Sequence, residues 1–314
     1  MNLLITRPLP DPVMTAACAR FDVTARDSTL PLSATELRAA LTDYDVVLPT
    51  LGDLFTAQVF ADVPAPRAKL LANFGVGFNH IDTKAAAAHG IAVTNTPGAV
   101  TDATADIALT LLLMTARRAG EAERMLRAGQ WQGWHPTQML GAQVSGKTVG
   151  IIGMGRIGRA IAQRCHYGFG MNVIFHSRSR TDAGLPAQQL PMAQVLQADF
   201  VVISVPSGPA THHLINAEAL AQMSPHGILI NIARGDIVDE AALATALQSR
   251  QIAGAGLDVY ENEPSITPAL LSMENVTLLP HLGTAVLETR TAMGMMAVAN
   301  LIAHLDGQPL PNPV

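Results

Sequence analysis

The run Gly153-Met154-Gly155-Arg156-Ile157-Gly158 constrains the fold of this chain more than any other feature. It follows the apolar segment VGII (149–152) and precedes the stretch RAIAQRC (159–165). Glycines at this spacing permit a tight turn, close approach of the backbone to a pyrophosphate and tight helix–strand packing, while the helix N-terminus supplies N–H donors. A bare glycine-rich turn is the alternative, but the flanking strand and helix favour a dinucleotide-binding βαβ unit.

The next expected strand, NVIFH (172–176), lacks the acidic residue that normally holds a free ribose 2′-hydroxyl. It is followed instead by Ser177, Arg178, Ser179 and Arg180. Ser177 can donate to a phosphate and the two arginines can pair with one, whereas a carboxylate would repel it. The loop therefore predicts NADPH/NADP+ as the cofactor, preferred over NADH. A solvated loop with chance arginines is the alternative.

Short apolar runs alternate with helical stretches along the whole chain, which is typical of βαβ units around parallel sheets. In the first part we expect strands at 2–6, 46–49, 69–75 and 91–95. In the second we expect six strands, at 148–155, 172–176, 200–205, 227–232, 253–259 and 276–280.

Two long apolar helices predict how these strands divide into domains. One is expected over 102–118, with Thr101 and Asp102 as candidate N-caps, and the other over 284–305. The last helix is long enough to pack back on the first domain. We therefore expect an α/β protein with a discontinuous substrate-binding domain, 1–98 plus 286–314, and an inserted NADP(H)-binding domain, 99–285.

Composition excludes several other classes of protein. Hydrophobic residues make up 49% of the 314 residues and charged residues 14%, which does not fit a disordered chain. There are 20 Lys+Arg against 25 Asp+Glu, with only three lysines and no basic stripe, so binding to nucleic acid is not favoured.

Cysteine usage and hydropathy point to a reducing compartment. Cys18 and Cys165 are far apart and outside any metal-ligand spacing, which argues against a disulfide scaffold or a structural zinc site. The N-terminal apolar run is broken at Arg7 and Pro8, and the longest later run, 107–114, is far short of the about 20 residues that a membrane span needs. We expect a cytoplasmic protein with no metal site.

Three polar residues near expected strand ends of the second domain form a candidate catalytic set: Arg234, Glu263 and His281. The planar fork of Arg234 suits the carboxylate and carbonyl of a 2-oxo acid. His281 can supply the proton that the carbonyl oxygen gains as hydride arrives, and Glu263 beside it would favour the protonated ring. Taken singly, each residue has a purely structural interpretation: Arg234 as a surface ion pair, Glu263 as a turn residue and His281 as a loop histidine.

The segments VGIIGMGRIG, NIARGDIVDEAAL, AGAGLDVYENEP and LLPHLG closely resemble those of the D-isomer-specific 2-hydroxyacid dehydrogenases. The resemblance covers nearly the whole chain. It implies a Rossmann-type cofactor domain inserted into a flavodoxin-like substrate domain, with a cleft between them. It also implies that Arg234 binds substrate, that His281 is the proton donor with Glu263 as its partner, and that the backbone of Val76 and Gly77 holds the substrate carboxylate.

Within the family the chain is most similar to the NADPH-dependent glyoxylate/hydroxypyruvate reductases. The shared features are TNTPGAVTDATAD (94–106), the segment from Trp131 to Pro136 and the Ser-Arg loop. In such enzymes the residue matching Trp134 can reach the neighbouring subunit's active site, which implies a homodimer. Alternatively, Trp131 and Trp134 merely fill a domain or dimer interface.

The remaining candidate cofactor contacts come from the glycine loop, from later strand ends and from the expected helix over 102–118. They are Thr104, Arg156, Ile157, Val205, Pro206, Thr211, Ile232, Ala233, Asp258 and Gly283. The segment PSGPAT (206–211), which contains the expected contacts Pro206 and Thr211, departs from the Leu-Thr-Pro-type phrase of many relatives.

The resemblance and the loop together predict NADPH-dependent reduction of small 2-oxo acids, glyoxylate to glycolate and hydroxypyruvate to D-glycerate. Alternatives in the same class are a broader D-2-hydroxyacid dehydrogenase and a phosphoglycerate dehydrogenase, although the cofactor loop lacks an acid and no regulatory domain is expected after Val314. A more remote alternative is a non-enzymatic NADP(H)-sensing module of the corepressor type.

Overall fold

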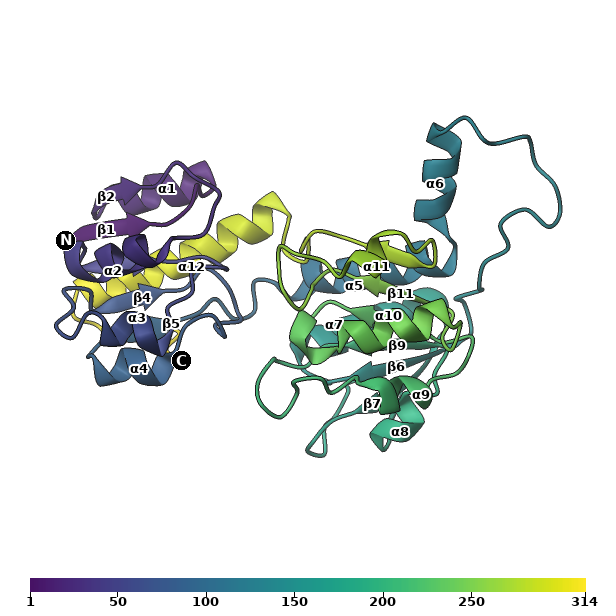
Figure 1. The fold of residues 1–314 in the computed structure, drawn as a ribbon. Helices are drawn as coiled ribbons and strands as arrows, with labels where there is room; N and C mark the ends of the chain where they lie inside the picture. Colours follow the sequence, from purple (N-terminus) through teal and green to yellow (C-terminus); the bar gives the residue numbers. More distant parts are fainter. The chain divides into compact units, whose positions relative to one another are not determined.

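The computed structural model describes residues 1–314, which form two compact units (Figure 1). One unit comprises residues 1–100 and 285–314, and the other comprises residues 101–284. These bounds differ by no more than two residues from those expected from the sequence.

The first unit is built on a five-stranded parallel sheet in the order β2-β1-β3-β4-β5. Its strands are β1 (Asn2–Ile5), β2 (Asp22–Ala25), β3 (Val46–Leu48), β4 (Leu70–Ala72) and β5 (Ala92–Thr94). Four were expected. β2 was missed because it is a largely exposed edge strand with the sequence DVTA, which has no apolar run.

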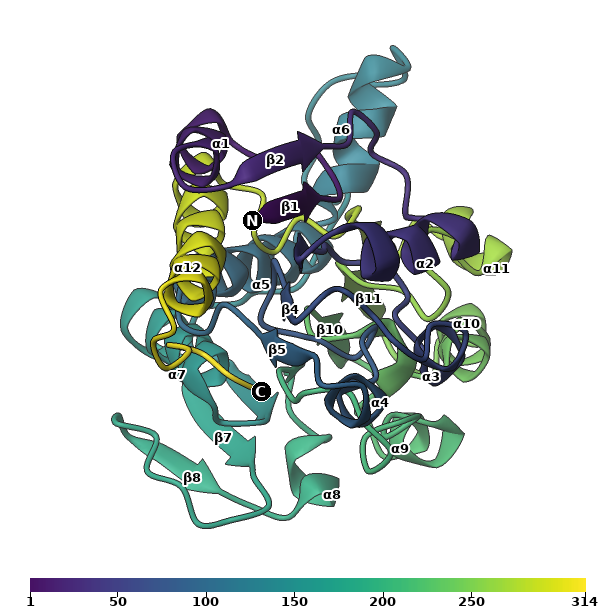
Figure 2. The ribbon, with the colours of Figure 1, turned by 90° about the vertical axis from the view of Figure 1, so that its left-hand side faces the viewer.

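Both faces of this sheet are covered because side chains alternate along each strand. Leu3 and Ile5 pack with α1 (Asp11–Cys18) and α12 (Leu287–Leu305), which lie side by side in Figure 2. Leu4 packs on the opposite face with α2 (Ala34–Asp43), α3 (Ala57–Ala61) and α4 (Thr83–Ala88). The C-terminal helix thus completes the core of the first unit.

The second unit contains a seven-stranded parallel sheet in the order β12-β11-β10-β9-β6-β7-β8. The strands are β6 (Thr148–Ile152), β7 (Asn172–His176), β8 (Ala187–Gln189), β9 (Phe200–Ile203), β10 (Ile228–Asn231), β11 (Gly254–Leu257) and β12 (Val276–Leu278). The expectation of six strands was wrong by one. β8 is a three-residue edge strand of sequence AQQ, too short and polar to be recognised.

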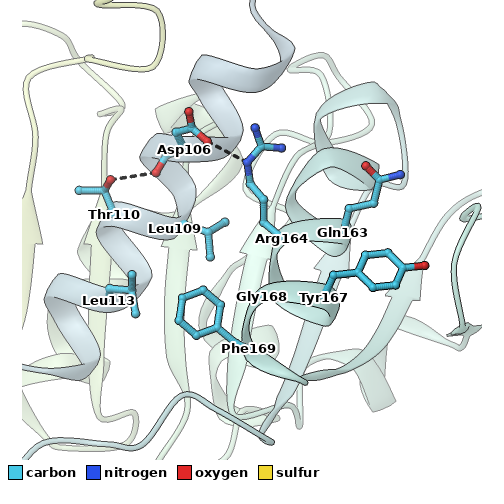
Figure 3. A pocket seen from close by; sticks show the side chains of 9 residues that line it. All are labelled: Asp106, Leu109, Thr110, Leu113, Gln163, Arg164, Tyr167, Gly168 and Phe169. Atoms are coloured by element: carbon cyan, nitrogen blue, oxygen red, sulfur yellow. Dashed lines mark hydrogen bonds and ion pairs between the residues drawn. The ribbon is translucent and has the colours of Figure 1, made fainter.

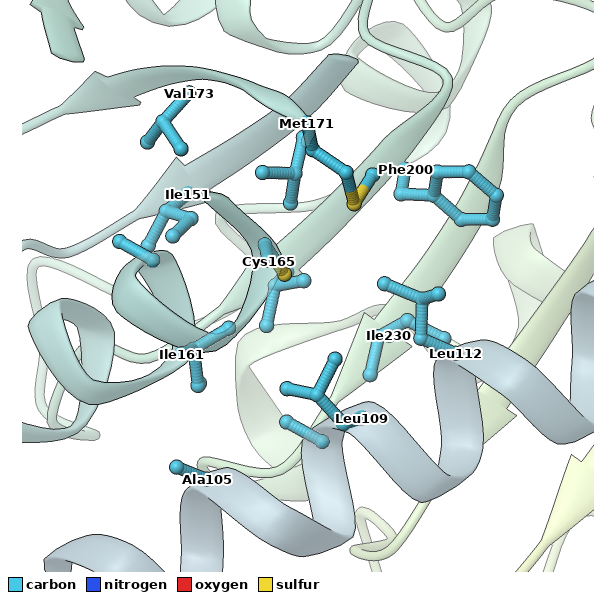
Figure 4. Packing of buried hydrophobic residues seen from close by; sticks show 14 of the residues in the cluster. Ala105, Leu109, Leu112, Ile151, Ile161, Cys165, Met171, Val173, Phe200 and Ile230 are labelled. Carbon is cyan, nitrogen blue, oxygen red and sulfur yellow. The ribbon is translucent and has the colours of Figure 1, made fainter. Parts of the chain in front are cut away.

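Helices cover both faces of this sheet as well. One face carries α5 (Thr101–Ala116), α7 (Arg156–Gln163) and a π-helical turn over Arg164–Gly168, around the core drawn in Figure 4. The other carries α8 (Met192–Val195), α9 (Ala217–Ala221), α10 (Glu240–Gln248) and α11 (Pro268–Leu271), and a 3-10 turn spans Gly235–Ile237. Thr101 and Asp102, expected as N-caps, are instead helical residues in the first turn of α5.

One segment of the second unit stands away from its own body. Figure 1 shows α6 (Ala119–Arg127) and the loop after it projecting from the sheet and its helices. Every residue from 126 to 137 is exposed. We call residues 119–143 the arm.

None of the helices combines the length and the apolar character needed to cross a lipid bilayer.

Candidate active site

The seven-stranded sheet gathers most of the predicted site residues at one edge. All its strands are parallel, so their carboxyl ends lie together, and the strand order reverses beside β6, where β7 lies on one side and β9 on the other. Ligands of open α/β sheets bind at such a reversal. The residues that follow the strand ends are Gly153 after β6, Ser177 after β7, Val205 after β9, Arg234 after β10, Asp258 after β11 and His281 after β12.

The three glycines of the loop after β6 serve different purposes. Gly153 has φ of +101°, and a Cβ there would lie 2.7 Å from the carbonyl oxygen of Ser204. A Cβ on Gly158 would lie 2.1 Å from the carbonyl oxygen of Gly153. At Gly155, by contrast, a Cβ would meet nothing within 4 Å. The outer glycines are thus required for packing, while the middle one leaves open space at the N-terminus of α7, which fits a pyrophosphate.

The loop after β7 is held by a residue that the sequence did not reveal. Nε2 of Gln189 in β8 donates to the carbonyl oxygens of Ser177 and Ser179, at 3.0 and 2.9 Å. The Ser177 hydroxyl accepts a hydrogen bond from the backbone N–H of Met154 at 3.3 Å, which connects this loop to the glycine loop. Because the edge strand β8 was not recognised in the sequence, nothing in the sequence indicates that Gln189 supports this loop.

Arg178 and Arg180 extend from this loop into solvent. Both are exposed, and neither forms an ion pair within the chain. Their guanidinium groups are therefore available to an anionic ligand. No carboxylate from the chain neutralises this positive charge.

The structure brings His281 and Glu263 into contact. Nδ1 of His281 lies 2.8 Å from Oε2 of Glu263, and the other oxygen of Glu263 accepts the N–H of Tyr260 at 3.0 Å. His281 has φ of +54°, a left-handed conformation that non-glycine residues seldom adopt. Strained conformations of this kind concentrate at functional sites, where the surrounding structure enforces them.

Asp258 enforces the position of the His281 loop. It is buried, and its two oxygens accept the N–H groups of Leu282 at 2.6 Å and Gly283 at 2.8 Å. The Thr104 hydroxyl donates to the carbonyl oxygen of Gly283 at 3.2 Å, which fixes the loop from α5. Both residues were predicted as cofactor contacts, and the bonds they make within the chain hold the backbone next to His281.

Arg234 is placed by a close approach between two loops. A Cβ on the following residue, Gly235, would lie 1.8 Å from the carbonyl carbon of Tyr260, so only glycine fits there. Asn231 Nδ2 donates to the carbonyl oxygen of Arg234 at 2.8 Å, and Nη1 of Arg234 donates to the carbonyl oxygen of Ala233 at 2.7 Å. The loop that carries Arg234 is thus packed against the loop that carries Glu263.

The electrostatics of this edge follow from burial and from charge pairing. Burial acts to raise the pKa of Glu263, but the hydrogen bond and charge of His281, the N–H of Tyr260 and the charge of Arg234 together hold it below its usual value. Burial lowers the pKa of Arg234, against the opposing effect of Glu263 and Asp236. Burial likewise raises the pKa of Asp258, although the N–H of Leu282 and the charge of His281 oppose the shift.

The remaining predicted cofactor contacts lie around the same edge. Arg156 and Ile157 are in the first turn of α7, and Ile232 and Ala233 directly follow β10. The Thr211 hydroxyl donates to the carbonyl oxygen of Pro206 at 2.8 Å, which closes the loop after β9 on itself.

In the first unit, Val76 and Gly77 lie in the loop after β4, and two asparagines fix the direction of its peptide groups. Asn73 Nδ2 donates to the carbonyl oxygens of Gly75 and Gly77, at 3.1 and 3.0 Å. Asn95 Nδ2 donates to the carbonyl oxygen of Val76 at 2.9 Å. Because these carbonyl oxygens accept hydrogen bonds from the two asparagines, the loop can present its N–H groups to an anion. Neither asparagine was predicted as a site residue, although an asparagine just before a glycine-rich loop is a recognisable signal.

Trp134 lies outside this set. It belongs to the exposed loop of the arm, where 79% of its surface is exposed, beside Trp131 with 52%. Neither tryptophan is buried by its own chain.

A shallow hollow of about 560 Å³ occupies a different part of the second unit (Figure 3). It is lined by residues of α5 and of the turn after α7, including Leu109, Tyr167 and Phe169. Arg164 and Asp106, an ion pair at 2.8 Å, also line it. None of the strand-end residues lines this hollow, so it is not part of the candidate active site.

Comparison with known proteins agrees with this geometry. Residues 109–283 match the NAD binding domain of the D-isomer specific 2-hydroxyacid dehydrogenases. The chain belongs to that family and is an oxidoreductase of it, and the predicted pair of parallel-sheet α/β domains is confirmed.

Its relatives have closely related names. The chain is 42% identical to a glyoxylate reductase of Thermococcus onnurineus, over 99% of this chain and 94% of that one. It is 38% identical to glyoxylate/hydroxypyruvate reductase B of Serratia proteamaculans, over 98% and 95% of the two chains. Among solved structures it is similar to an NADPH-dependent glyoxylate/hydroxypyruvate reductase from Sinorhizobium meliloti, in complex with NADP and malonate. The TM-score is 0.88, with 37% identity over 100% of this chain and 96% of that one.

Proposed function

We propose that this protein reduces small 2-oxo acids with NADPH, converting glyoxylate to glycolate and hydroxypyruvate to D-glycerate. The observation that carries the proposal is the His281–Glu263 pair, 2.8 Å apart, at the same sheet edge as the open glycine loop. The names of the relatives support this substrate class.

The cofactor, when bound, supplies a hydride to the carbonyl carbon. The backbone around Gly155, the N-terminus of α7 and the Ser177 loop would hold it. Because Nδ1 of His281 faces Glu263, the proton at Nε2 is the one available to the carbonyl oxygen. The guanidinium of Arg234 would bind the carbonyl and carboxylate, and the N–H groups of Val76 and Gly77 would bind the carboxylate.

Initial rates with four acceptors test the reaction and its substrate range. Glyoxylate, hydroxypyruvate, pyruvate and phenylpyruvate are each supplied with NADPH, and oxidation is followed at the nicotinamide absorbance. We expect the fastest turnover with glyoxylate and hydroxypyruvate. Fastest turnover with phenylpyruvate would favour a broader dehydrogenase, and no turnover with any of the four would contradict the proposal.

The preference for NADPH is proposed to depend on Ser177, Arg178 and Arg180. The two unpaired arginines would bind the 2′-phosphate, and the Ser177 hydroxyl would donate to it. In Arg178→Ala we expect the KM for NADPH to rise at least about tenfold, because a charged contact contributes about 1.5–3 kcal/mol, while the KM for NADH stays the same. Arg250→Ala, exposed in the same unit and before the amino end of β11, is the control. An equal effect on both cofactors would overturn the assignment.

We further propose a homodimer in which the arm contacts a second copy of the chain. The large apolar side chains of the arm are exposed: Trp131 by 52%, Trp134 by 79% and Leu140 by 67%. Exposed apolar side chains gathered in one segment are typical of a protein–protein contact. Light scattering should give the mass of two chains, and the double variant Trp131→Ser/Trp134→Ser should give a larger monomer fraction. A monomeric wild-type protein would contradict the proposal.

A further inference from the structure

The loop after β9 brings two consecutive histidines against a glutamate of the loop after β11. Each of the three residues, His212, His213 and Glu261, offers one possible ligand atom, and these three atoms lie within 4.8 Å of one another. Nε2 of His213 is 2.8 Å from Oε1 of Glu261, and the two imidazole rings lie with centroids 4.1 Å apart and planes tilted by 31°. None of these side chains has a role in the proposed reaction.

The backbone holds this cluster in place from several directions. His213 has φ of +47°, a left-handed conformation, and its N–H donates to the carbonyl oxygen of Asp236 at 2.9 Å. The N–H of Glu261 donates to Oε1 of Glu240 at 2.6 Å. A non-glycine residue in this conformation indicates that the fold enforces the placement of the His213 ring. The fold therefore fixes the positions of His213 and Glu261, which already contact each other.

We propose that His212, His213 and Glu261 form a binding site for one divalent transition-metal ion of the Zn²⁺ class. Two imidazoles and one carboxylate suit Zn²⁺, whereas Mg²⁺ and Ca²⁺ prefer oxygen ligands alone. Ligands about 2.0–2.1 Å from a tetrahedral ion lie about 3.3 Å from one another, so modest side-chain rotations close the cluster around the metal.

The site is open to solvent on one side, so that water can complete the coordination of the metal ion. His212 is exposed, and the side chains of His213 and Glu261 are 33 and 27% exposed. A water molecule can therefore enter and leave as the fourth ligand. The sequence predicted no metal site because the ligands come from two loops about 50 residues apart, outside any recognised ligand spacing.

A bound ion would cross-link the loops after β9 and β11. It would replace the hydrogen bond between His213 and Glu261 with two metal bonds. Glu261 lies two residues before Glu263, so the ion would brace the loop that carries the partner of His281. Binding itself does not depend on the proposed function, and its test needs no substrate.

The experiment titrates the chelator-stripped protein with Zn²⁺ in competition with a chromophoric chelator. We expect one strong equivalent per chain in the wild type and at least a tenfold loss of affinity in His212→Ala and in Glu261→Gln. His226→Ala is the matched control, because His226 belongs to the same unit but contacts Asp199 and Ser224, each at 3.3 Å, and not the cluster. Its affinity should equal that of the wild type. Circular dichroism without metal verifies that each variant is folded.

Two further measurements identify the ligands. Co²⁺ in place of Zn²⁺ should give the visible absorption of a tetrahedral site in the wild type and His226→Ala, and lose it in His212→Ala. Zn²⁺ should also raise the melting temperature of the wild type, and 1 mM Mg²⁺ should not. The proposal is overturned if the wild type binds no strong equivalent, or if His212→Ala and Glu261→Gln bind Zn²⁺ as tightly as the wild type.

Discussion

His281 depends on neighbouring carboxylates for both the orientation of its ring and the position of its backbone. Glu263 contacts its Nδ1, while Asp258 holds the backbone of the two residues that follow it. These are separate tasks, because one carboxylate faces the ring and the other faces peptide N–H groups. Substitutions at the two sites should therefore have different kinetic signatures.

The first prediction concerns pH. Since the pKa of Glu263 is held below its usual value, its carboxylate is ionised throughout the neutral range and is lost as a partner for Nδ1 of His281 only in acid. The kcat of the wild type should therefore be steady near neutral pH and fall in acid, as Glu263 becomes protonated. Glu263→Gln has no carboxyl group that titrates there, so this acid fall should be absent. Profiles of kcat for both proteins test this.

Two results would contradict the prediction for the pair. One is a flat profile in the wild type when hydride transfer limits the rate. The other is a Glu263→Gln profile that falls at the same pH as the wild type. His281→Ala serves as the reference, with an expected loss of about 100-fold or more in kcat and unchanged binding of NADPH.

The second prediction separates positioning from cofactor binding at Asp258. In Asp258→Asn, the side-chain amide would face one of the two backbone N–H groups and lose its hydrogen bond, at a cost of about 1–3 kcal/mol. We expect kcat to drop by about 10- to 100-fold while the dissociation constant of NADPH, measured by fluorescence titration, stays the same. A large loss of NADPH affinity at unchanged kcat would instead make Asp258 a cofactor contact.

At the scale of elements, the loops after β10 and β11 act together because Gly235 allows them to touch. The third prediction is that Gly235→Ala destabilises the protein by at least about 3 kcal/mol, since its Cβ would lie 1.8 Å from the backbone of Tyr260. Urea unfolding measures the loss. Gly168→Ala is the control, because a Cβ there meets nothing within 4 Å. Equal stability of the two variants would refute the close packing of these loops.

The elements also show how much of the structure could be predicted from the sequence. Strands with apolar runs, such as VGII and FVVI, were predicted, and so was the placement of Arg234, Glu263 and His281 near strand ends. The edge strands β2 and β8 were missed because edge strands need no buried face. Side-chain supports such as Gln189 and Asn73 were missed for a related reason: hydrogen bonds to loop carbonyls leave no periodic pattern.

At the scale of the whole molecule, each unit has its own hydrophobic cores. Two buried clusters lie within residues 101–284, and two lie within residues 1–100 and 285–314. The proposed NADPH contacts all belong to the second unit. A ligand that binds only the native form of one unit stabilises that unit selectively.

The fourth prediction is therefore calorimetric. We expect two transitions on heating, and NADPH at about 100 times its dissociation constant should stabilise one of them by about 2.7 kcal/mol. For a unit of 184 residues this corresponds to a rise of about 7 °C, because the unfolding entropy is about 2.1 cal/mol/K per residue. The other transition should not move. If both transitions rise equally, or only one transition exists, the cofactor is coupled to the folding of the entire chain. In Arg178→Ala the same NADPH concentration should give a smaller rise, which ties the selective stabilisation to the loop after β7.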